Sequence, residues 1–131
     1  MKILLLSMHS IHATRWIENL KESGHELYWF DISGKGKINT LESIIQFTGW
    51  KKRKLPYIKG EHWFSKKFPS FYQLIRPFLE VTENEALEKI IKSIQPDLVQ
   101  SFEMQSCSYP IVKTMLKYPK IKWLYNCWGN D

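Results

Sequence analysis

The sequence predicts an α/β fold, in which an open, mostly parallel sheet carries helices on both faces. Three observations lead to it: a continuous apolar run at Lys2–Ser7, a strand–helix–strand order over residues 1–32, and a helix–strand–helix–strand order over residues 83–127. A strand that is apolar throughout, rather than at every second residue, is typical of burial on both faces. Strands that alternate with helices build parallel sheets.

The first unit is a crossover of strand, helix and strand within about thirty residues. After the opening strand, a helix is expected over His12–Ser23, and Gly24 suits its left-handed C-terminal cap. The apolar positions of this helix fall on one face and are Ala13, Trp16, Ile17 and Leu20. The aromatic segment Glu26–Ile32 is the second predicted strand.

The middle of the chain gives weaker signals. Ser33–Lys37 is expected to be a loop, and Ile38–Phe47 suits either a helix or a strand. Gly49–Pro69 is basic, aromatic and expected to be irregular, whereas Ser70–Glu80 is expected to be a helix that Pro77 kinks or ends. We therefore interpret residues 49–80 as an insertion in a single domain.

The second half begins with a capping box, in which Thr82 accepts from the amide three residues on and Glu85 reaches back. The helix Glu83–Ser93 follows, and Pro96 forces the chain out of it. The remaining predicted elements are the strand Asp97–Phe102, a helix over Ser106–Tyr118 with Pro110 in its first turn, and the strand Lys122–Cys127.

Composition narrows the classes of protein. With 131 residues, 44% of them apolar, the chain suits one domain with its own core. Cys107 and Cys127 show neither metal-ligand spacing nor a disulfide framework, and we expect both to be buried thiols of a reducing compartment. No apolar run approaches the roughly 20 residues of a membrane span, and the start lacks a signal-peptide cleavage site, so a cytoplasmic location is expected.

The carboxyl ends of parallel strands are where such sheets bind ligands, so functional residues are expected over 8–12, 31–37, 102–105 and 128–131. The turn after the first strand lacks the G-x-G-x-x-G pattern, and Gly34-Lys35-Gly36 is not followed by a Lys-Ser/Thr pair. The sequence therefore argues against a dinucleotide site and against a phosphate loop. No cofactor and no metal site are expected.

Three residues at this edge carry candidate chemistry. Ser10, or the amides beside it, suits either an anion site at a helix N-terminus or an ordinary N-cap. Arg15 suits either a phosphate contact or an ion pair with Asp31 or Glu103. Glu103 is the weak candidate for a catalytic base or a ligand of sugar hydroxyls, and it equally suits a cap for the helix near Ser106.

Cations and aromatic residues are interleaved within the insertion. The candidates for contact with a membrane are Trp50, Lys51, Lys52, Arg53, Lys54, Trp63, Phe64, Lys66 and Lys67. Together with a net charge of +6, this mixture suits an anionic membrane surface or lipid phosphate. It also suits, less well, single-stranded nucleic acid, and a solvated, partly packed insertion remains an alternative.

Several segments resemble a known family. Lys2-Ile3-Leu4-Leu5-Leu6, Ser10-Ile11-His12-Ala13-Thr14-Arg15-Trp16 and Gly24-His25-Glu26-Leu27 resemble the start of bacterial family 4-like glycosyltransferases. Pro96-Asp97-Leu98-Val99-Gln100 and the ending Trp128-Gly129-Asn130-Asp131 resemble later motifs, which relatives often write as Pro-Asp-Ile-Val-His and His/Trp-Gly-Ser-Asp. The resemblance runs from Met1 to Asp131 but is dense only at its two ends, and Ile38–Leu79 carries none of it.

The resemblance implies the amino-terminal, acceptor-side half of a GT-B fold, which pairs two Rossmann-like domains. It implies an enzyme of surface polysaccharide synthesis that moves a sugar, without a metal, from a nucleotide-sugar donor to a glycan or lipid-phosphate-linked acceptor. The donor would be held mainly by a second domain, so residues 1–131 are expected to be an incomplete domain without turnover of its own. A peripheral position on the inner membrane face is expected for the parent enzyme.

Carried over position by position, the resemblance implies which residues line the cleft. Ser10, His12 and Arg15 would border it, and the segment opposite would be Trp128, Gly129, Asn130 and Asp131. Two departures matter, because the usual histidine after the third predicted strand is replaced around Gln100–Phe102, and Trp128 stands where many relatives have a histidine. A catalytic role is therefore not carried over to Trp128. The alternative is a Rossmann-like module that binds anions, membranes or nucleic acid without catalysis.

Overall fold

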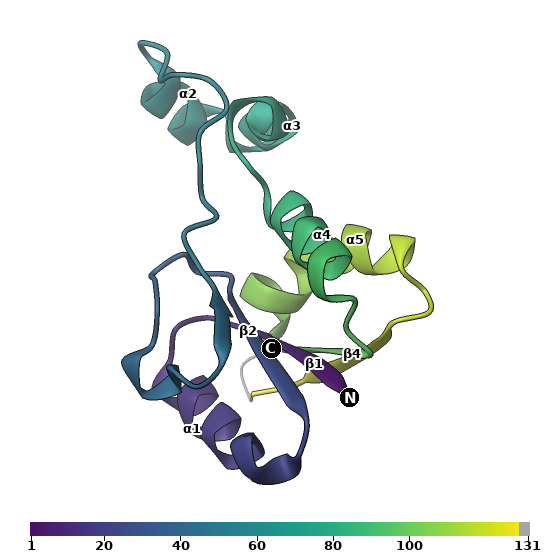
Figure 1. Ribbon diagram of the computed structural model, residues 1–131. Helices are drawn as coiled ribbons and strands as arrows, with labels where there is room; N and C mark the ends of the chain where they lie inside the picture. Colours follow the sequence, from purple (N-terminus) through teal and green to yellow (C-terminus); the bar gives the residue numbers. More distant parts are fainter. Residues whose placement is uncertain (129–131) are drawn as a thin grey trace.

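A sheet of parallel strands forms the centre of the molecule, which the computed structural model describes for residues 1–128 (Figure 1). Its strands are β1 (Lys2–Ser7), β2 (Glu26–Asp31), β3 (Ile45–Phe47), β4 (Leu98–Phe102) and β5 (Lys122–Asn126). Their order within the described residues is β3-β2-β1-β4-β5, and every pairing is parallel. The predicted α/β class, with an open parallel sheet of the Rossmann-like kind, is confirmed.

The strand order reverses at the middle of the sheet. β1 pairs with β2 on one side and with β4 on the other, so that Leu4 lies beside both Tyr28 and Val99. Because connections leave a reversal in opposite directions, a crevice forms outside the carboxyl ends of the two central strands. This places the expected ligand edge at the ends of β1 and β4.

Helices cover both faces of the sheet. On one face α1 (Ile11–Leu20) packs Ile17 against Leu5 and Trp29. On the other, α4 (Glu83–Ile94) and α5 (Val112–Lys117) cover the alternate residues of β1, among them Leu4 (Figure 1). This two-sided burial explains why β1 is apolar at every position from residue 3 to residue 6.

Most predicted boundaries hold within a few residues. The first helix is α1 followed by a 3₁₀ turn at Lys21–Ser23, and Gly24 ends it with a φ of +75°. The capping threonine before α4 accepts from the amide of Glu85 at 3.3 Å, as expected, but the carboxylate of Glu85 binds Lys54 at 2.6 Å instead of reaching back to the amide of Thr82. The segment left open at Ile38–Phe47 contains a 3₁₀ turn, Asn39–Leu41, and the short strand β3.

The insertion is more ordered than predicted. Gly49–Pro69 was expected to be irregular but contains α2 (Glu61–Lys67), and α3 (Pro69–Leu79) follows almost at once. Pro77 lies two residues before the end of α3, in agreement with the expectation that it ends the helix. None of the helices among residues 1–128 combines the length and apolarity that crossing a membrane requires.

The helix expected over Ser106–Tyr118 is divided into three pieces. A π-helical turn, Met104–Ser108, leads into a 3₁₀ turn, Tyr109–Ile111, before α5 begins. Pro110 explains the division, because it has no N–H to donate and its ring clashes with the carbonyl four residues earlier.

The insertion projects from the body as a helical arm, which we define as residues 55–78 (Figure 1). Its two ends run antiparallel beside each other through a bridge between Arg53 and Glu80. The amide of Val81 donates to the carbonyl of Lys52 at 2.9 Å, and the amide of Lys54 donates to the carbonyl of Leu79 at 2.8 Å. The arm therefore leaves and rejoins the body at one place.

Candidate functional site

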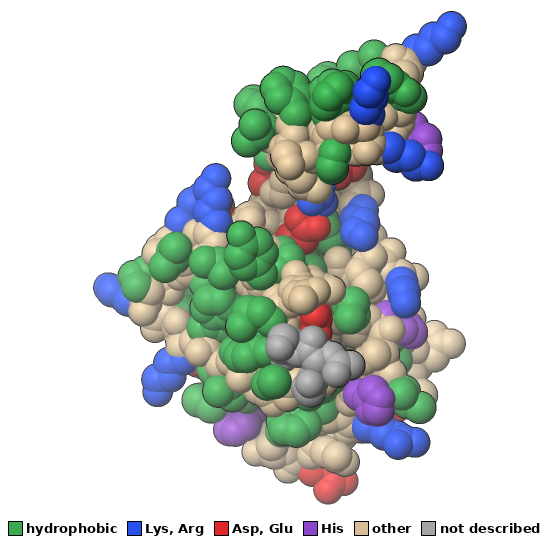
Figure 2. All heavy atoms as spheres, turned by 180° about the vertical axis from the view of Figure 1, so that it is seen from behind, with side chains coloured by type: hydrophobic (Ala, Val, Ile, Leu, Met, Phe, Trp, Pro, Cys, Tyr) green, Lys and Arg blue, Asp and Glu red, His purple; other side chains and the backbone are tan. Residues whose placement is uncertain are grey.

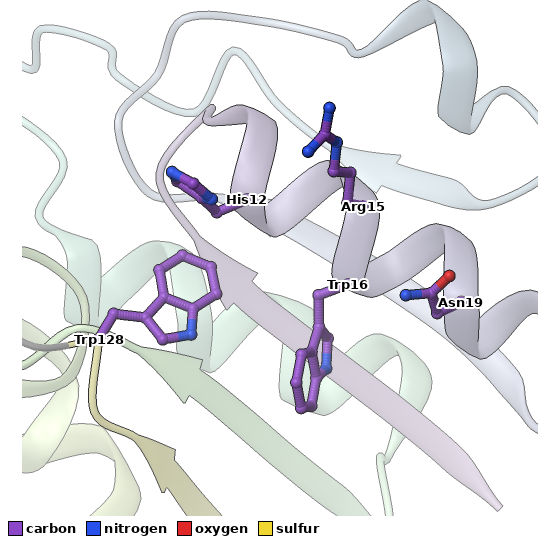
Figure 3. A pocket seen from close by; sticks show the side chains of 5 residues that line it. All are labelled: His12, Arg15, Trp16, Asn19 and Trp128. Atoms are coloured by element: carbon purple, nitrogen blue, oxygen red, sulfur yellow. The ribbon is translucent and has the colours of Figure 1, made fainter.

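A hollow of about 520 Å³ lies beside α1, at the edge where β1 and β4 end (Figure 3). Its lining residues are His12, Arg15, Trp16, Asn19 and Trp128. The first four follow the i, i+3, i+4, i+7 spacing of one helical face, so α1 presents them together. The volume falls in the range of ligand-binding pockets, about 300–1,000 Å³.

Aromatic contacts join α1 to the ends of β4 and β5. Phe102, the buried last residue of β4, packs against Trp128 with ring centroids 4.9 Å apart and against Trp16 at 5.9 Å. The ring of His12 meets Trp128 edge-on at 6.2 Å. The resemblance implied that the segments around His12 and Trp128 face each other. In the structure these two side chains are in contact across the hollow.

The hollow combines flat apolar surfaces with one fixed positive charge. The indoles of Trp16 and Trp128 border it, and Arg15 stands exposed at its rim (Figure 3). Among residues 1–128, no carboxylate forms an ion pair with Arg15. Indole faces suit the apolar side of a ring-shaped ligand, and a guanidinium suits phosphate oxygens.

Ser10 acts as the N-cap of α1. Its side-chain oxygen accepts from the amide of Ala13 at 3.2 Å, and its carbonyl accepts from the hydroxyl of Thr14 at 2.9 Å. The structural alternative for this serine is confirmed, and its role toward an anion stays a prediction. Ser10 follows β1 by three residues and so shares the edge with the hollow.

Glu103 caps the turn that follows β4. Its carboxylate accepts from the amides of Gln105 at 3.2 Å and Ser106 at 2.8 Å, as the capping alternative predicted. Its backbone has a φ of +70° and a ψ of 136°, a region that side-chain-bearing residues rarely adopt. Strained backbone and π-helical turns both concentrate at functional sites, so the catalytic prediction for Glu103 stays open.

The pairing predicted for Arg15 with Asp31 or Glu103 is not formed. Asp31 is fully buried and accepts from the amides of Ser33 at 3.0 Å and Gly36 at 2.8 Å, so it holds its own loop in place. The carboxylate of Glu103 is engaged by its own turn. Neither acid needs the guanidinium, because each is already satisfied by backbone amides.

The first residues of the basic aromatic stretch belong to the body of the domain. Trp50 packs edge-on against Phe30 with centroids 5.8 Å apart, and its indole N–H donates to the carbonyl of Asp31 at 2.7 Å. Lys51 extends its ammonium to the carbonyl of Ser33 at 2.8 Å. These two contacts fasten the stretch to the end of β2, and Trp50 is only partly exposed.

Arg53 and Lys54 form the base of the arm. Arg53 binds both carboxylate oxygens of Glu61, at 2.7 and 2.9 Å, and its guanidinium lies over the ring of Tyr57 at 4.0 Å. The hydrogen bond from Arg53 lowers the pKa of Glu61 to about 2, and the same bond raises the pKa of the guanidinium. Lys54 donates to Glu85 at 2.6 Å.

The remaining candidates for membrane contact lie on the surface. Lys52, Trp63, Lys66 and Lys67 are exposed, and Phe64 is half-buried between the two helices of the arm. Lys67 holds its ammonium over the ring of Trp63 at 4.7 Å.

Three expectations remain to be placed. Gly129, Asn130 and Asp131 lie outside the described residues. Cys107 is buried as expected, but Cys127 is exposed, because it follows the edge strand β5 and no element covers it within residues 1–128. Within the same residues, no three His, Cys, Asp or Glu side chains converge as metal ligands do.

Sequence reasoning missed two residues of the hollow, because Trp16 was assigned to core packing and Asn19 was not considered. Trp16 is 40% exposed, whereas Ile17 beside it is fully buried. The signal was present in the spacing, since His12, Arg15, Trp16 and Asn19 share one face of a predicted helix.

Ser10, Glu103 and Trp128 all follow the carboxyl ends of neighbouring strands, β1, β4 and β5, and therefore share one edge of the sheet. Comparison of the sequence with protein-family models and with curated proteins found no match. A function is therefore proposed from the fold and from the residues that line the hollow.

Proposed function

We propose that this chain is the acceptor-side domain of a sugar-transferring enzyme of the family 4-like glycosyltransferase type that its motifs resemble. One observation supports this most strongly. A hollow with two indoles and a guanidinium that forms no ion pair within residues 1–128 lies where the strand order of a parallel sheet reverses. That is the place where open α/β sheets bind ligands, although a fold by itself assigns no function.

In this proposal the hollow receives a glycan or a lipid-phosphate-linked acceptor at the cytoplasmic membrane face. The faces of Trp16 and Trp128 hold a sugar ring, and Arg15 binds a phosphate oxygen. In the transfer itself, the anomeric carbon breaks its bond to the donor's phosphate and forms one to an acceptor hydroxyl oxygen. The hydroxyl proton leaves with the nucleoside diphosphate or passes to solvent. The domain contributes by fixing the acceptor in place.

Direct binding measurements test this proposal. The probe is farnesyl pyrophosphoryl-N-acetylglucosamine, kept below its micelle concentration and titrated into residues 1–131 while the indole N–H signals are followed by NMR. We expect Arg15→Ala to weaken binding by about tenfold or more, because a charge-assisted hydrogen bond is lost. Lys89→Ala is the matched control, since this exposed cation is on α4, across the sheet.

Equal binding by Arg15→Ala and by the control would contradict the proposed site. A second readout concerns turnover, which we expect to be absent when residues 1–131 alone meet nucleotide-sugars and the same probe. Sugar transferred by this chain alone would contradict its assignment as an acceptor-side domain only.

A further inference from the structure

The helical arm holds a network of polar contacts between its helices, beside the half-buried Phe64, and leaves several large apolar side chains exposed. Between its helices, Glu61 accepts from Arg53 and from the hydroxyl of Tyr72 at 2.9 Å, and its side chain is only 8% exposed. At the base, Arg76 pairs with Glu83 at 2.9 Å. A soluble helical hairpin normally buries its apolar face instead, so this arrangement indicates that the outer surface has a partner.

The outer surface of the arm is an apolar ridge, which we define as Trp63, Phe71, Leu74 and Phe78. The last three are spaced i, i+3 and i+7 along α3, and so form one stripe. They are 55%, 71% and 73% exposed, and Trp63 is 59% exposed. Figure 2 shows hydrophobic side chains gathered along the projecting arm, with basic side chains at its outer end.

The excess positive charge of the protein is concentrated on the arm together with the segments that lead into it and out of it. Residues 50–79 carry eight of the 19 Lys and Arg but one of the 13 Asp and Glu, so the rest of the chain is close to neutral. Lys66 and Lys67 end α2 beside the ridge. Five of the eight cations lack a carboxylate partner among the described residues, and they are Lys51, Lys52, Lys59, Lys66 and Lys67.

We propose that the helical arm inserts its apolar ridge into the surface of an anionic bilayer, with the flanking lysines contacting lipid phosphates. Interfacial helices place an apolar face with Trp and Phe about 5–10 Å into the boundary of headgroups and acyl chains, while Lys remains at the headgroups. The arm presents that combination, because Lys67 lies directly over the ring of Trp63. This inference does not depend on sugar transfer.

The same observations weigh against nucleic acid and against a second copy of the chain. Stacking with bases needs flat rings along a groove, but the most exposed members of the ridge include an aliphatic side chain, Leu74, on a convex helix. A second copy would bring together two surfaces of the same strong positive charge, which repel each other.

Co-sedimentation with vesicles tests the apolar part. Vesicles of phosphatidylcholine alone are compared with vesicles that also contain phosphatidylglycerol. We expect Leu74→Asp combined with Phe78→Asp to lower the partition coefficient on the mixed vesicles by about tenfold or more, because buried apolar area is lost. Leu116→Asp combined with Tyr109→Asp is the matched control with the same change in charge, since these residues are 75% and 74% exposed outside the arm. Far-UV circular dichroism checks that each variant is folded.

The charged part is tested in the same assay. Lys66→Glu with Lys67→Glu should weaken binding to the mixed vesicles by at least about fivefold per lysine, because each basic residue near such a surface contributes about that factor. Lys89→Glu with Lys120→Glu is the matched control, since both lysines are exposed and lie outside the arm.

Four results on vesicle binding and oligomeric state would overturn the proposal, and a fifth concerns nucleic acid. The four are no binding to either vesicle, equal binding to both compositions, a ridge variant that binds like its control, and a wild-type dimer that the ridge variant dissociates while vesicles are not bound. Tight binding of a single-stranded oligonucleotide without vesicle binding would assign the arm to nucleic acid and overturn it equally.

Discussion

Glu103 is held in a backbone conformation that glycine adopts easily and other residues rarely. With φ at +70° and ψ at 136°, it is one of two non-glycine residues with positive φ among residues 1–128. Its neighbours fix this geometry: its amide donates to the carbonyl of Asn126 at 3.1 Å, and its carbonyl accepts from the amide of Ser108 at 3.1 Å. Substitutions at this position can separate the backbone strain from the capping role of the carboxylate.

The magnitudes follow from these two contributions. Glu103→Ala keeps the strain but loses the cap, so it should lower the free energy of unfolding by about 1 kcal/mol. Glu103→Gly also loses the cap but releases strain of about 1–3 kcal/mol. Glycine also makes the unfolded chain more flexible, which offsets about 0.4–1 kcal/mol of that gain. The glycine variant should therefore be more stable than the alanine variant by about 1.3 kcal/mol, taking the middle of each range.

Urea unfolding, followed by tryptophan fluorescence and circular dichroism, measures the difference. The midpoints should move in the order alanine below glycine while the slopes stay equal, since the slope reports the surface exposed on unfolding. Glu103→Gln keeps one acceptor oxygen and should lie between wild type and alanine. If the glycine variant is no more stable than the alanine variant, the strain is not present and the argument for a special role at this position fails.

Three further predictions concern the core, the arm and the thiols. Leu87→Ala removes a fully buried side chain and should cost about 2–5 kcal/mol in urea unfolding, whereas Leu116→Ala at an exposed site should change stability by less than about 0.5 kcal/mol. The lowered pKa of Glu61, about 2, means that its ion pair stabilises the arm above the ordinary carboxyl pKa of 4.5 and is lost as pH falls through about 2. The protection of the arm's amides, measured against their intrinsic exchange rate at each pH, should therefore fall over that range, and unchanged protection in acid would contradict it. In the folded protein, Cys127 should react rapidly with Ellman's reagent, whereas Cys107 should react only in denaturant. Rapid reaction of both thiols would refute the assigned burial.

The central strands could be predicted because burial on both faces leaves a continuous apolar run. β1 and β2 are such runs, and their register beside each other follows from the short crossover between them. The start of α4 was equally readable, because the Thr82 side chain caps it locally by accepting from the amide of Glu85. Signals of this kind depend on neighbours in sequence or on simple burial.

Of the arm, α3 could be predicted as a helix over Ser70–Glu80, but α2 and the outward orientation of the exposed apolar side chains could not, because the periodicity argument assumes that apolar side chains face inward. Several large apolar side chains of α2 and α3 are exposed, and the pairing of Arg53 with Glu61 lies between the helices beside the half-buried Phe64. An ion pair between residues eight positions apart produces no periodic pattern of apolar residues in the sequence. At the site, the same assumption misplaced a residue in the other direction. Trp16 falls at a position that the periodicity assigns to the core, and yet its side chain borders the hollow.

The antiparallel pair at Lys52 and Val81 has a consequence for how such a molecule can vary. Because the chain leaves the body and rejoins it at this pair, the parallel strands do not need the arm between them for their alignment. Changing its size or chemistry shifts no register elsewhere. Under the two proposals made above, membrane binding by the arm and ligand binding in the hollow can therefore be changed separately by substitution.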